Sequence, residues 1–554
     1  MALFINGNNI DFKYEGQVDY ILEDVTFRLD RSSRVGLVGD NGSGKTTLLH
    51  LISGELVPYH GEIEKPTDIK IGCLPQEVSL EGRKTVEEYL FSAQPTLHEL
   101  REKIAAADQT TPAYADLIAE YYARGGESFE IEFAKILTAF NLDTRIIEMP
   151  VSLLSGGEKT KVAIAGILLR KPDLMLLDEP TNHLEMTSLE WLEGFLKSSP
   201  VPFLTVSHDR RFLDNTIGEI WEIEYQTLTK YSGNYSFYKK KKEQEIKREQ
   251  HLYEIQQRKI RKLRQAARMS RDAAASHQAE TRAEGYAPVF ESIMNEARHA
   301  MKAAKRIEKR IQRMIEKEEA KKPFIERDRK ITIKSTSLKN PTVATVTGLS
   351  KTYGARKILD NINLTVANGT KLGIIGRNGS GKSTFLKIIA GALDDFGGEY
   401  KWAPRAGIGY YSQEHENLDP KKTILDEVLQ GRNSDQTRAR TILGRLNIRR
   451  DKVYQSVATL SLGERSKTAL ARILFSEANV LILDEPTNHM EISAREAFEE
   501  ALEDYSGTVL IATHDRYLLD RIATEILDME TGQHYKGRYA DFAGFFEERN
   551  SSES

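Results

Sequence analysis

The chain repeats one set of motifs in the same order and at the same intervals. The octapeptide at 39–46, GDNGSGKT, returns at 376–383 as GRNGSGKS. Three later intervals are also equal in the two copies: Lys45 to Gln76 and Lys382 to Gln413 are 31 residues, Ser155 to Asp178 and Ser461 to Asp484 are 23, and Asp178 to His208 and Asp484 to His514 are 30. Chance does not readily give three equal intervals between such residues, so we expect two homologous modules, at 1–236 and 341–545.

The repeated octapeptide follows a short apolar strand and has the pattern Gly-x-x-x-x-Gly-Lys-Ser/Thr. In this pattern the backbone amides and the N-terminus of the next helix bind phosphate oxygens, the lysine reaches the outer phosphates, and the hydroxyl residue can ligate Mg²⁺. Two copies at a fixed distance from the other motifs predict two nucleotide sites. The candidate ATP-binding residues are Gly39, Asp40, Asn41, Gly42, Ser43, Gly44, Lys45, Thr46 and Thr47, and Gly376, Arg377, Asn378, Gly379, Ser380, Gly381, Lys382, Ser383 and Thr384.

Each module also has an unbroken apolar strand that ends in two acids, and a later apolar strand followed by a histidine. Unbroken apolar strands are typical of a central parallel sheet and predict an α/β fold. The first acid is expected to hold Mg²⁺, and the second to orient or deprotonate the attacking water, while the histidine faces the γ-phosphate. A lone histidine is more often structural, but its identical placement in both copies favours a catalytic role. The residues are Asp178, Glu179 and His208, and Asp484, Glu485 and His514.

The motifs around these acids resemble those of a known family. LSGGE at 154–158 and LSLGE at 460–464 resemble the signature motif of ATP-binding-cassette (ABC) proteins, and DEPTNHL at 178–184 and DEPTNHM at 484–490 are similar to the wording of the ABC-F branch. The resemblance covers essentially the whole chain. It implies two P-loop ABC ATPase domains of α/β class, each with a mixed sheet and a helical subdomain, that hydrolyse ATP with Mg²⁺.

The resemblance also implies a head-to-tail sandwich in which each ATP lies between the phosphate loop of one cassette and the signature of the other. The first site would combine Lys45, Thr46, Gln76, Asp178, Glu179 and His208 with Ser461 and Gly463. The second would combine Lys382, Ser383, Gln413, Asp484, Glu485 and His514 with Ser155, Gly156 and Gly157. The implied metal ligands are Thr46, Gln76 and Asp178, and Ser383, Gln413 and Asp484. Adenine would stack on Tyr14 or Tyr353, and Tyr353 has the better spacing because Tyr14 lies two residues further from Leu22 than Tyr353 does from Leu359.

Two features depart from the family pattern. Leu462 replaces the first glycine of the signature in the second cassette, where backbone usually approaches the γ-phosphate, so we expect two unequal sites. Glu185 and Glu491 stand where the family usually has aspartate after the histidine. The longer glutamate side chain keeps the negative charge, but the sequence does not decide whether it makes the contact with the other cassette that the family's aspartate makes.

The modules differ in one interval and are separated by a basic segment. Gln76 to Ser155 spans 79 residues, whereas Gln413 to Ser461 spans 48. The additional residues fall at about 85–127, where apolar residues recur at helical spacing, which predicts a protruding helical arm or an ordinary enlarged helical subdomain. The segment 239–322 carries 24 Lys and Arg against 13 Asp and Glu, although the whole chain has a net charge of −4.

The segment between the modules is expected to be a long antiparallel helical linker, at 237–340. Ile246, Tyr253 and Ile260 recur every seven residues, and a second apolar stripe contains Ile307 and Ile311. We expect a first helix at about 239–271, a turn that forms the tip at about 272–290, and an extended return at 323–340. A short tail would follow at 546–554.

Basic residues are expected on one face of each linker helix. Such stripes suit RNA phosphates, with binding that weakens as salt rises, and the alternative is a solvated coiled-coil surface. The resemblance implies a cytoplasmic translation factor that binds the ribosome, with its rRNA and tRNA, near the tRNA exit site when ATP is bound, and leaves after hydrolysis. It would modulate translation or displace a bound antibiotic. The candidate RNA-binding residues are Arg261, Arg264, Arg268 and Arg271, and Arg298, Lys302, Lys305 and Lys309.

Composition narrows the other possibilities. No apolar run approaches the roughly 18 residues that span a bilayer, so no membrane partner is expected, and the chain is expected to be a monomer with an intramolecular cassette pair. The single cysteine, Cys73, excludes an internal disulfide, and its apolar neighbours predict a core residue. The ATPase subunit of a transporter, a DNA-associated ATPase of repair and a purely structural binding protein stay open. The basic insertion argues against the first, two whole cassettes against the second, and Glu179 and Glu485 against the third.

Overall fold

The computed structural model describes residues 5–80, 84–182, 184–283, 287–316, 330–335, 338–412, 418–432, 435–488 and 490–542. The chain divides into two compact units. One unit consists of Met1–Tyr235 and Lys330–Ser554 and contains both modules, and the other is Ser236–Arg329.

The first module contains a three-stranded antiparallel sheet and a six-stranded mixed sheet. The small sheet has the order β2-β1-β4, and the large sheet the order β5-β6-β7-β3-β8-β9, in which all neighbours are parallel except β8 and β9. The strands are β1 (Ile5–Phe12), β2 (Leu22–Leu29), β3 (Arg34–Val38), β4 (His60–Glu64), β5 (Ile71–Leu74), β6 (Leu174–Asp178), β7 (Phe203–Val206), β8 (Glu219–Glu224) and β9 (Thr227–Ser232).

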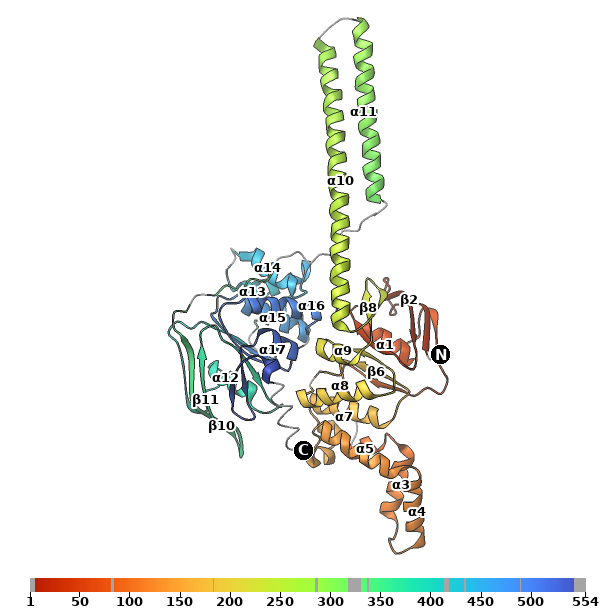
Figure 1. Ribbon diagram of the computed structural model, residues 1–554, viewed down its shortest axis with the longest axis vertical. Helices are drawn as coiled ribbons and strands as arrows, with labels where there is room; N and C mark the ends of the chain where they lie inside the picture. Colours follow the sequence, from red (N-terminus) through yellow and green to blue (C-terminus); the bar gives the residue numbers. More distant parts are fainter. Residues whose placement is uncertain are drawn as a thin grey trace. The chain divides into compact units, whose positions relative to one another are not determined.

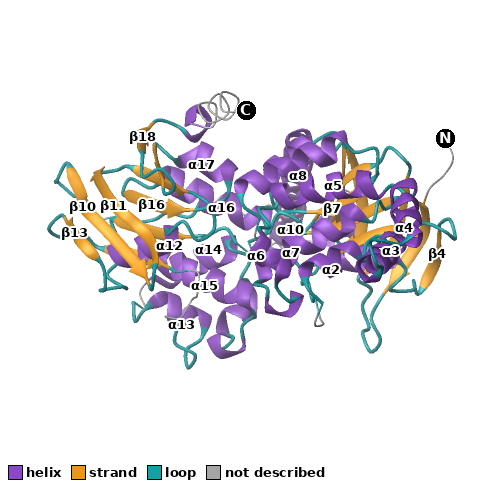
Figure 2. Ribbon diagram, turned by 90° about the horizontal axis from the view of Figure 1, so that it is seen from below, coloured by secondary structure: helices purple, strands orange, loops and turns teal. Residues whose placement is uncertain are grey.

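The second module repeats this topology strand for strand. Its small sheet has the order β11-β10-β13 (Figure 2), and its large sheet has the order β14-β15-β16-β12-β17-β18. The strands are β10 (Thr342–Tyr353), β11 (Arg356–Ala367), β12 (Lys371–Ile375), β13 (Gly397–Trp402), β14 (Ile408–Tyr411), β15 (Val480–Asp484), β16 (Thr508–Ala512), β17 (Glu525–Asp528) and β18 (His534–Lys536). The expected α/β fold with mixed sheets is confirmed in both modules.

Strand register explains why the motif residues meet. Asp178, the last residue of β6, pairs with Val206 of β7, and Asp484 of β15 pairs with Ala512 of β16. Both strand pairs are fully buried, and parallel strands bring their carboxyl ends to one edge of the sheet. The acids therefore lie beside the loops that carry the two histidines.

Helices cover the sheets and form the helical subdomains. Those of the first module are α1 (Lys45–Ser53), α2 (Val86–Phe91), α3 (Pro95–Ala106), α4 (Pro112–Ala123), α5 (Gly126–Ala139), α6 (Thr144–Glu148), α7 (Gly156–Leu169), α8 (Met186–Ser198) and α9 (Arg210–Thr216), with a 3₁₀ turn η1 (Val151–Leu153). Those of the second are α12 (Lys382–Ile389), α13 (Ile424–Leu429), α14 (Gln436–Arg445), α15 (Leu462–Phe475), α16 (Ile492–Asp504) and α17 (Arg516–Ile522), with the 3₁₀ turns η3 (Arg450–Tyr454) and η4 (Val457–Thr459).

The additional residues of the first module are helical. The segment 85–127 holds α2, α3, α4 and the start of α5, and α3 packs beside α4 (Figure 1). Both α3 and α4 begin with proline, which suits the first turn of a helix because its missing N–H has no intrahelical acceptor there.

The linker contains two helices, α10 (Tyr235–Ala283) and α11 (Ala287–Glu316), that pack as an antiparallel pair (Figure 1). Ile260 and Ile311 are buried together in the seam, with Leu263 and Ile307 partly buried beside them. The antiparallel pairing is thus confirmed. Ile246 is exposed, however, because with this pairing it lies beyond the described end of α11.

The expected turn at 272–290 is too wide. The first helix continues from Arg271 to Ala283 and the second begins at Ala287, which leaves 284–286, outside the described residues. The heptad pattern ends near 271, but the alanine-rich sequence that follows has high helix propensity and keeps the backbone helical. Pro288 lies within the expected turn but is the second residue of α11, where proline is tolerated.

The return to the second module is described at 330–335 and 338–340, which belong to no helix or strand. Ile331 and Ile333 are buried in the core of the second module beside α13, α14 and α15. The residues 323–329 of the expected return lie outside the described residues. The prediction that Cys73 is a core residue is wrong: it lies on β5, the edge strand of the large sheet, and points to the exposed face.

Candidate nucleotide-binding sites

Both phosphate loops turn sharply into a helix through glycine. Gly44 precedes α1 with φ 101°, and Gly381 precedes α12 with φ 97°, a conformation that favours glycine. A Cβ atom on Gly44 would lie 2.9 Å from Cγ2 of Ile21, and one on Gly381 would lie 2.6 Å from Cδ2 of Leu359. Both the backbone angle and the close packing therefore require glycine at these two positions. The amides of each loop and the N-terminus of the following helix together form a phosphate cradle.

The loop lysines are buried and fold over their own loops. Lys45 Nζ donates to the carbonyls of Gly39 at 2.8 Å and Asp40 at 2.9 Å, and Lys382 Nζ donates to Gly376 at 2.7 Å and Arg377 at 3.1 Å. Burial lowers the pKa of both lysines, and neighbouring carboxylates oppose that shift. Each ammonium thus lies at the mouth of its phosphate loop.

The expected Mg²⁺ ligands are brought together in the first site. Thr46 Oγ1 donates to Asp178 Oδ2 at 2.7 Å. A hydroxyl and a carboxylate side by side are hard oxygen donors, which fit Mg²⁺. In the second site Asp484 is buried at the end of β15 and Ser383 is half-buried at the start of α12. Gln76 is exposed after β5, and Gln413 lies outside the described residues.

The second acids have a strained backbone and one unpaired oxygen each. Glu179 has φ 51° and Glu485 has φ 48°, unusual values for residues other than glycine. Their Oε2 atoms accept from the backbone N–H of His208 at 3.3 Å and of His514 at 3.4 Å. Their Oε1 atoms are buried and accept no hydrogen bond from any described residue. Burial raises the pKa of both carboxyls to about 8.

Both histidines lie beside these acids. His208 Nε2 is 3.4 Å from Glu179 Oε1, and His514 Nε2 is 3.5 Å from Glu485 Oε1. His514 Nε2 is also 3.2 Å from Asn378 Oδ1, in its own phosphate loop. Burial lowers the pKa of His514 to about 3 and that of His208 well below its usual value, so both imidazoles are neutral near pH 7.

One cavity of about 510 Å³ joins the phosphate loop of the second cassette to the signature of the first. Its floor is made by Lys382, Ser383 and Thr384, and Glu485 and His514 line its side. Ser155 and Gly157 come from the other cassette. The structure therefore brings several predicted members of the second site, from both modules, to one cavity, although Asp484 and Gly156 are not among the residues that line it.

A smaller cavity of about 310 Å³ lies at the first site. Asp40 and Asn41 of the phosphate loop face Ser461 and Gly463 of the second signature across it. Each signature serine caps its helix: the N–H of Glu158 donates to Ser155 Oγ, and that of Glu464 to Ser461 Oγ, each at 3.4 Å. Their hydroxyls are thus fixed at helix N-termini, where an anion is favoured.

The two candidate adenine platforms differ. Tyr353 lines the larger cavity together with Arg356 and Ile358, two residues that the sequence did not single out. Tyr14 is not among the residues that line the smaller cavity; its hydroxyl is 3.3 Å from Thr47 Oγ1. The arrangement agrees with the preference for Tyr353.

Leu462 does not enter the first site as expected. Its side chain is 59% exposed and is not among the residues that line the smaller cavity. A Cβ atom on the equivalent Gly156 would meet nothing within 4 Å. The first position of the signature helix therefore has room for a side chain that points to solvent.

Glu185 and Glu491 pair within their own cassettes. Glu185 Oε1 is 3.2 Å from Lys161 Nζ, and Glu491 Oε1 is 2.9 Å from Lys467 Nζ, both buried. The lysines lie on the signature helices α7 and α15, six residues after the capping serine. Each glutamate therefore links the strand-end motif to the signature of the same cassette.

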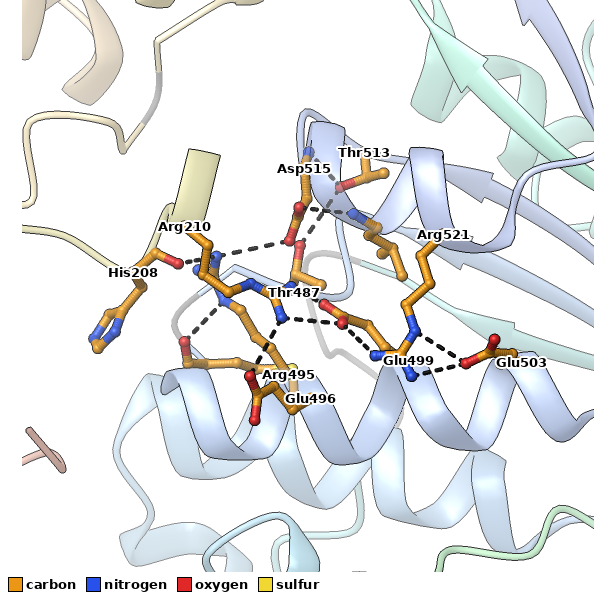
Figure 3. Close-up of polar contacts among 12 residues, drawn as sticks. His208, Arg210, Thr487, Arg495, Glu496, Glu499, Glu503, Thr513, Asp515 and Arg521 are labelled. Carbon is orange, nitrogen blue, oxygen red and sulfur yellow. Dashed lines mark hydrogen bonds and ion pairs between the residues drawn. The ribbon is translucent and has the colours of Figure 1, made fainter. Parts of the chain in front are cut away.

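Sequence reasoning missed the buried ion pairs that join the cassettes, of which Figure 3 shows the one between Arg210 and Glu499. Arg210 of α9 pairs with Glu499 of α16, and Arg516 of α17 pairs with Glu193 of α8. Each arginine stands two residues after its histidine, and the offset of 306 residues that relates the signature, acid and histidine motifs of the two cassettes also relates both pairs. The repetition of these arginines and glutamates at the same offset was the sequence signal that could have identified the two pairs.

The predicted basic residues of the linker are exposed, as far as their side chains are described: Arg261, Arg264, Arg268, Arg271, Arg298, Lys302, Lys305 and Lys309. Arg271 forms an ion pair with Glu308 of α11, and Arg268 lies 4.0 Å from Asp272. Most of the stripe is thus available to an anionic partner.

Comparison with known proteins identifies the family. A family model described as ABC transporter matches residues 22–182 and 359–488. ABC transporter F family member 5 of Arabidopsis thaliana is 31% identical over 96% of this chain and 76% of its own length. The chain belongs to the F branch of the ATP-binding-cassette family. This ABC-F protein is an ATP hydrolase.

Other relatives match this ABC-F protein along almost its whole length. The putative ATP-binding protein YdiF of Bacillus subtilis (strain 168) is 33% identical over 94% of this chain and 80% of its own, and the energy-dependent translational throttle protein EttA of Haemophilus influenzae is 31% identical over 94% and 92%. A solved structure titled RNase-L Inhibitor shares the fold with a TM-score of 0.61 at 20% identity, over 94% of this chain and 87% of its own. Within the described ranges, none of the helices is long and apolar enough to cross a membrane.

Proposed function

We propose that this ABC-F protein is a cytoplasmic translation factor that binds the ribosome near the tRNA exit site with ATP bound and is released after hydrolysis. The observation that carries the proposal is the similarity to the translational throttle protein EttA, which covers 94% of this chain and 92% of that protein. Because the similarity extends over 94% of this chain, it includes the basic linker as well as the two cassettes. A transporter subunit or a DNA-repair ATPase would not be expected to share this basic segment.

In the proposed hydrolysis, Glu179 and Glu485 act on the attacking water. Each has a buried Oε1 atom that no described residue satisfies, and a carboxylate whose pKa is about 8 can take a proton near neutral pH. The neutral histidine beside each acid would position the γ-phosphate. These roles rest on geometry that is the same in both sites.

Binding of ATP would use the phosphate loop of one cassette and the signature helix of the other. Lys45 or Lys382 would give up its loop carbonyls to hold the outer phosphates, and Ser461 or Ser155 would approach from the opposite side. Thr46 with Asp178, and Ser383 with Asp484, would hold Mg²⁺. That ion, when bound, supplies positive charge that neutralises the phosphate oxygens.

The linker would carry nucleotide state to the ribosome because each cassette holds one of its ends. Tyr235, the first residue of α10, is buried, and Ile331 and Ile333 at the return are buried in the core of the second cassette. Closure of the cassettes on ATP would therefore move both ends of the linker. Its exposed basic stripe would bind rRNA or tRNA phosphates.

Sedimentation tests ribosome binding directly. The double variant Glu179→Gln with Glu485→Gln is expected to hold ATP without hydrolysis and to travel with ribosomes through a sucrose gradient. The native chain with ADP, and the same variant carrying Lys45→Ala and Lys382→Ala, are matched controls that should stay at the top. If the trapped protein stays at the top with ATP at low salt, the proposal fails.

Charge reversal separates the RNA stripe from general basicity. Arg261→Glu, Arg264→Glu and Arg268→Glu remove three stripe residues, whereas Arg248→Glu, Lys259→Glu and Lys262→Glu make the same change of charge on another face of α10. Removing one phosphate-binding cation is expected to reduce the slope of log K against log salt by roughly 0.7 to 0.9. Only the first set of substitutions should weaken ribosome binding. Equal weakening by both sets would contradict a specific RNA-binding face and favour the alternative of a solvated coiled-coil surface.

Displacement of a bound antibiotic is a narrower form of the same proposed activity. It predicts that cells expressing the native chain grow at higher concentrations of a ribosome-targeting drug than cells expressing the double glutamine variant. Equal growth across drug classes would leave modulation of translation as the proposed role.

A further inference from the structure

One difference between the two cassettes lies in the contact between them, beside a histidine loop. The offset of 306 residues that relates Glu185 to Glu491 and Glu193 to Glu499 aligns Leu189 with Arg495. Leu189 lies on α8 and Arg495 on α16, and both side chains are buried. An apolar residue and a cation therefore occupy equivalent places in the contact.

Arg495 contacts the histidine loop of the other cassette. Its NH1 donates to the backbone carbonyl of His208 at 3.1 Å, and its Nε donates to the carbonyl of Met490 at 3.0 Å (Figure 3). NH1 is also 3.8 Å from Asp515 Oδ2. The guanidinium is thus anchored in the second cassette and reaches into the first.

The contact fixes a residue that is already held on its other side. The N–H of His208 donates to Glu179 Oε2, while its carbonyl accepts from Arg495. Both backbone groups of His208 are therefore bound, one by the proposed catalytic acid and one by the opposite cassette. Leu189 has no polar side-chain atom, so it cannot hold the carbonyl of His514 in the same way.

Electrostatics supports the same reading. The positive charge of Arg495 opposes the effect of burial on the pKa of Glu179 and adds to the lowering of the pKa of His208. The loop lysine of each cassette acts on its own acid and histidine in the same way, Lys45 at the first site and Lys382 at the second, so Arg495 is an additional charge at the first site.

We propose that Arg495 is a positioning residue for hydrolysis at the first ATP site, because it holds His208 in place across the cassette contact, and that the second site has no counterpart. The proposal rests on the catalytic roles proposed above for Glu179 and His208. It makes the geometry of the first site dependent on cassette closure, whereas the histidine of the second site is held from within its own cassette by Asn378.

The test uses variants that leave one site active. In a Glu485→Gln background, which reports the first site, Arg495→Leu is expected to lower kcat about tenfold and to leave KM for ATP nearly unchanged, because a charge-assisted hydrogen bond that orients the site is removed. Arg495→Lys, which keeps a charged donor, should recover most of kcat. Arg495 also lines the larger cavity at the second site. In a Glu179→Gln background, which reports that site, Arg495→Leu should therefore lower kcat by no more than about threefold, clearly less than at the first site.

A second measurement needs neither background. Single-turnover hydrolysis with both sites filled is expected to separate, in Arg495→Leu, into one phase within about threefold of the native rate and one about tenfold slower than native. Equal slowing of both sites, a change in KM alone, or no change would each overturn the proposal. All these assays measure ATP hydrolysis by the chain without ribosomes. Their outcome therefore does not depend on whether the chain binds ribosomes.

Discussion

Arg210 of the first cassette and Glu499 of the second form a buried ion pair with two hydrogen bonds across the cassette contact. The side chains of Arg210 and Glu499 are 1% and 0% exposed. Arg516 and Glu193 form the matching pair. Each histidine loop is therefore followed by one buried arginine that pairs with a glutamate of the opposite cassette. The histidine loops and the cassette contact are therefore parts of one structure.

Breaking this pair on one side is expected to destabilise the protein. Arg210→Met leaves Glu499 buried with one cationic partner fewer and should cost roughly 3 to 5 kcal/mol, whereas Arg210→Met with Glu499→Leu should recover much of it. Arg211→Met is the matched control: its pair with Asp520 is half-exposed at 3.5 Å and should contribute less than about 1 kcal/mol. Calorimetry measures all three, and a double variant no more stable than the single would contradict the assignment.

Leu462 is expected to matter little for hydrolysis. Because its side chain is exposed and does not line the cavity of the first site, Leu462→Gly in the Glu485→Gln background should change kcat by less than about twofold. Steady-state phosphate release gives the answer. A gain of tenfold or more would restore the expectation that this leucine, rather than Arg495, makes the sites unequal.

The repeat was sufficient to predict the paired folds because its motifs mark strand ends and helix starts. Lys45 opens α1, Asp178 closes β6, and Ser155 caps α7, and their equivalents do the same in the second cassette. Once these ends are fixed, the parallel sheet brings them to one edge. The grouping of the nucleotide-site residues follows from local sequence for this reason.

Contacts between the cassettes could not be predicted in the same way. Nothing local to Arg495 indicates that it reaches the carbonyl of His208, 287 residues away in sequence. The positive φ of Glu179 is likewise imposed by the strand-to-loop junction and not by glutamate itself. Helix limits failed where two signals conflicted: the loss of the heptad near Arg271 suggested a turn, while alanine content kept α10 helical.

His514 is expected to make stability depend on pH in the acid range. Burial lowers its pKa from 6.5 to about 3, so below about pH 6.5 the unfolded chain binds a proton that the folded chain excludes. Above pH 6.5 neither state binds this proton, so His514 does not lower the free energy of unfolding. As the pH falls from 6.5 toward 3, protonation of the unfolded chain lowers the free energy of unfolding, by up to about 2 kcal/mol at pH 5. His514→Gln should therefore reduce the fall in Tm between about pH 7 and pH 5. Parallel pH curves for variant and native chain would show that another group dominates.

The aromatic residues near the phosphate loops should contribute unequally to ATP affinity. Tyr353 is 51% exposed on the wall of the larger cavity, and with Lys351 Nζ over one face of its ring, 4.8 Å from the centroid, the other face can stack on a base, whereas Tyr14 is bonded through its hydroxyl to Thr47. Tyr353→Ala is expected to weaken ATP binding at the second site about tenfold, since stacking on one ring contributes roughly 1 to 3 kcal/mol, and Tyr353→Phe should bind almost normally. Tyr14→Ala should weaken the first site by less than about threefold. Calorimetric titration measures each site when the other loop carries Lys45→Ala or Lys382→Ala, and a larger loss for Tyr14→Ala than for Tyr353→Ala would reverse the assignment of the adenine platform.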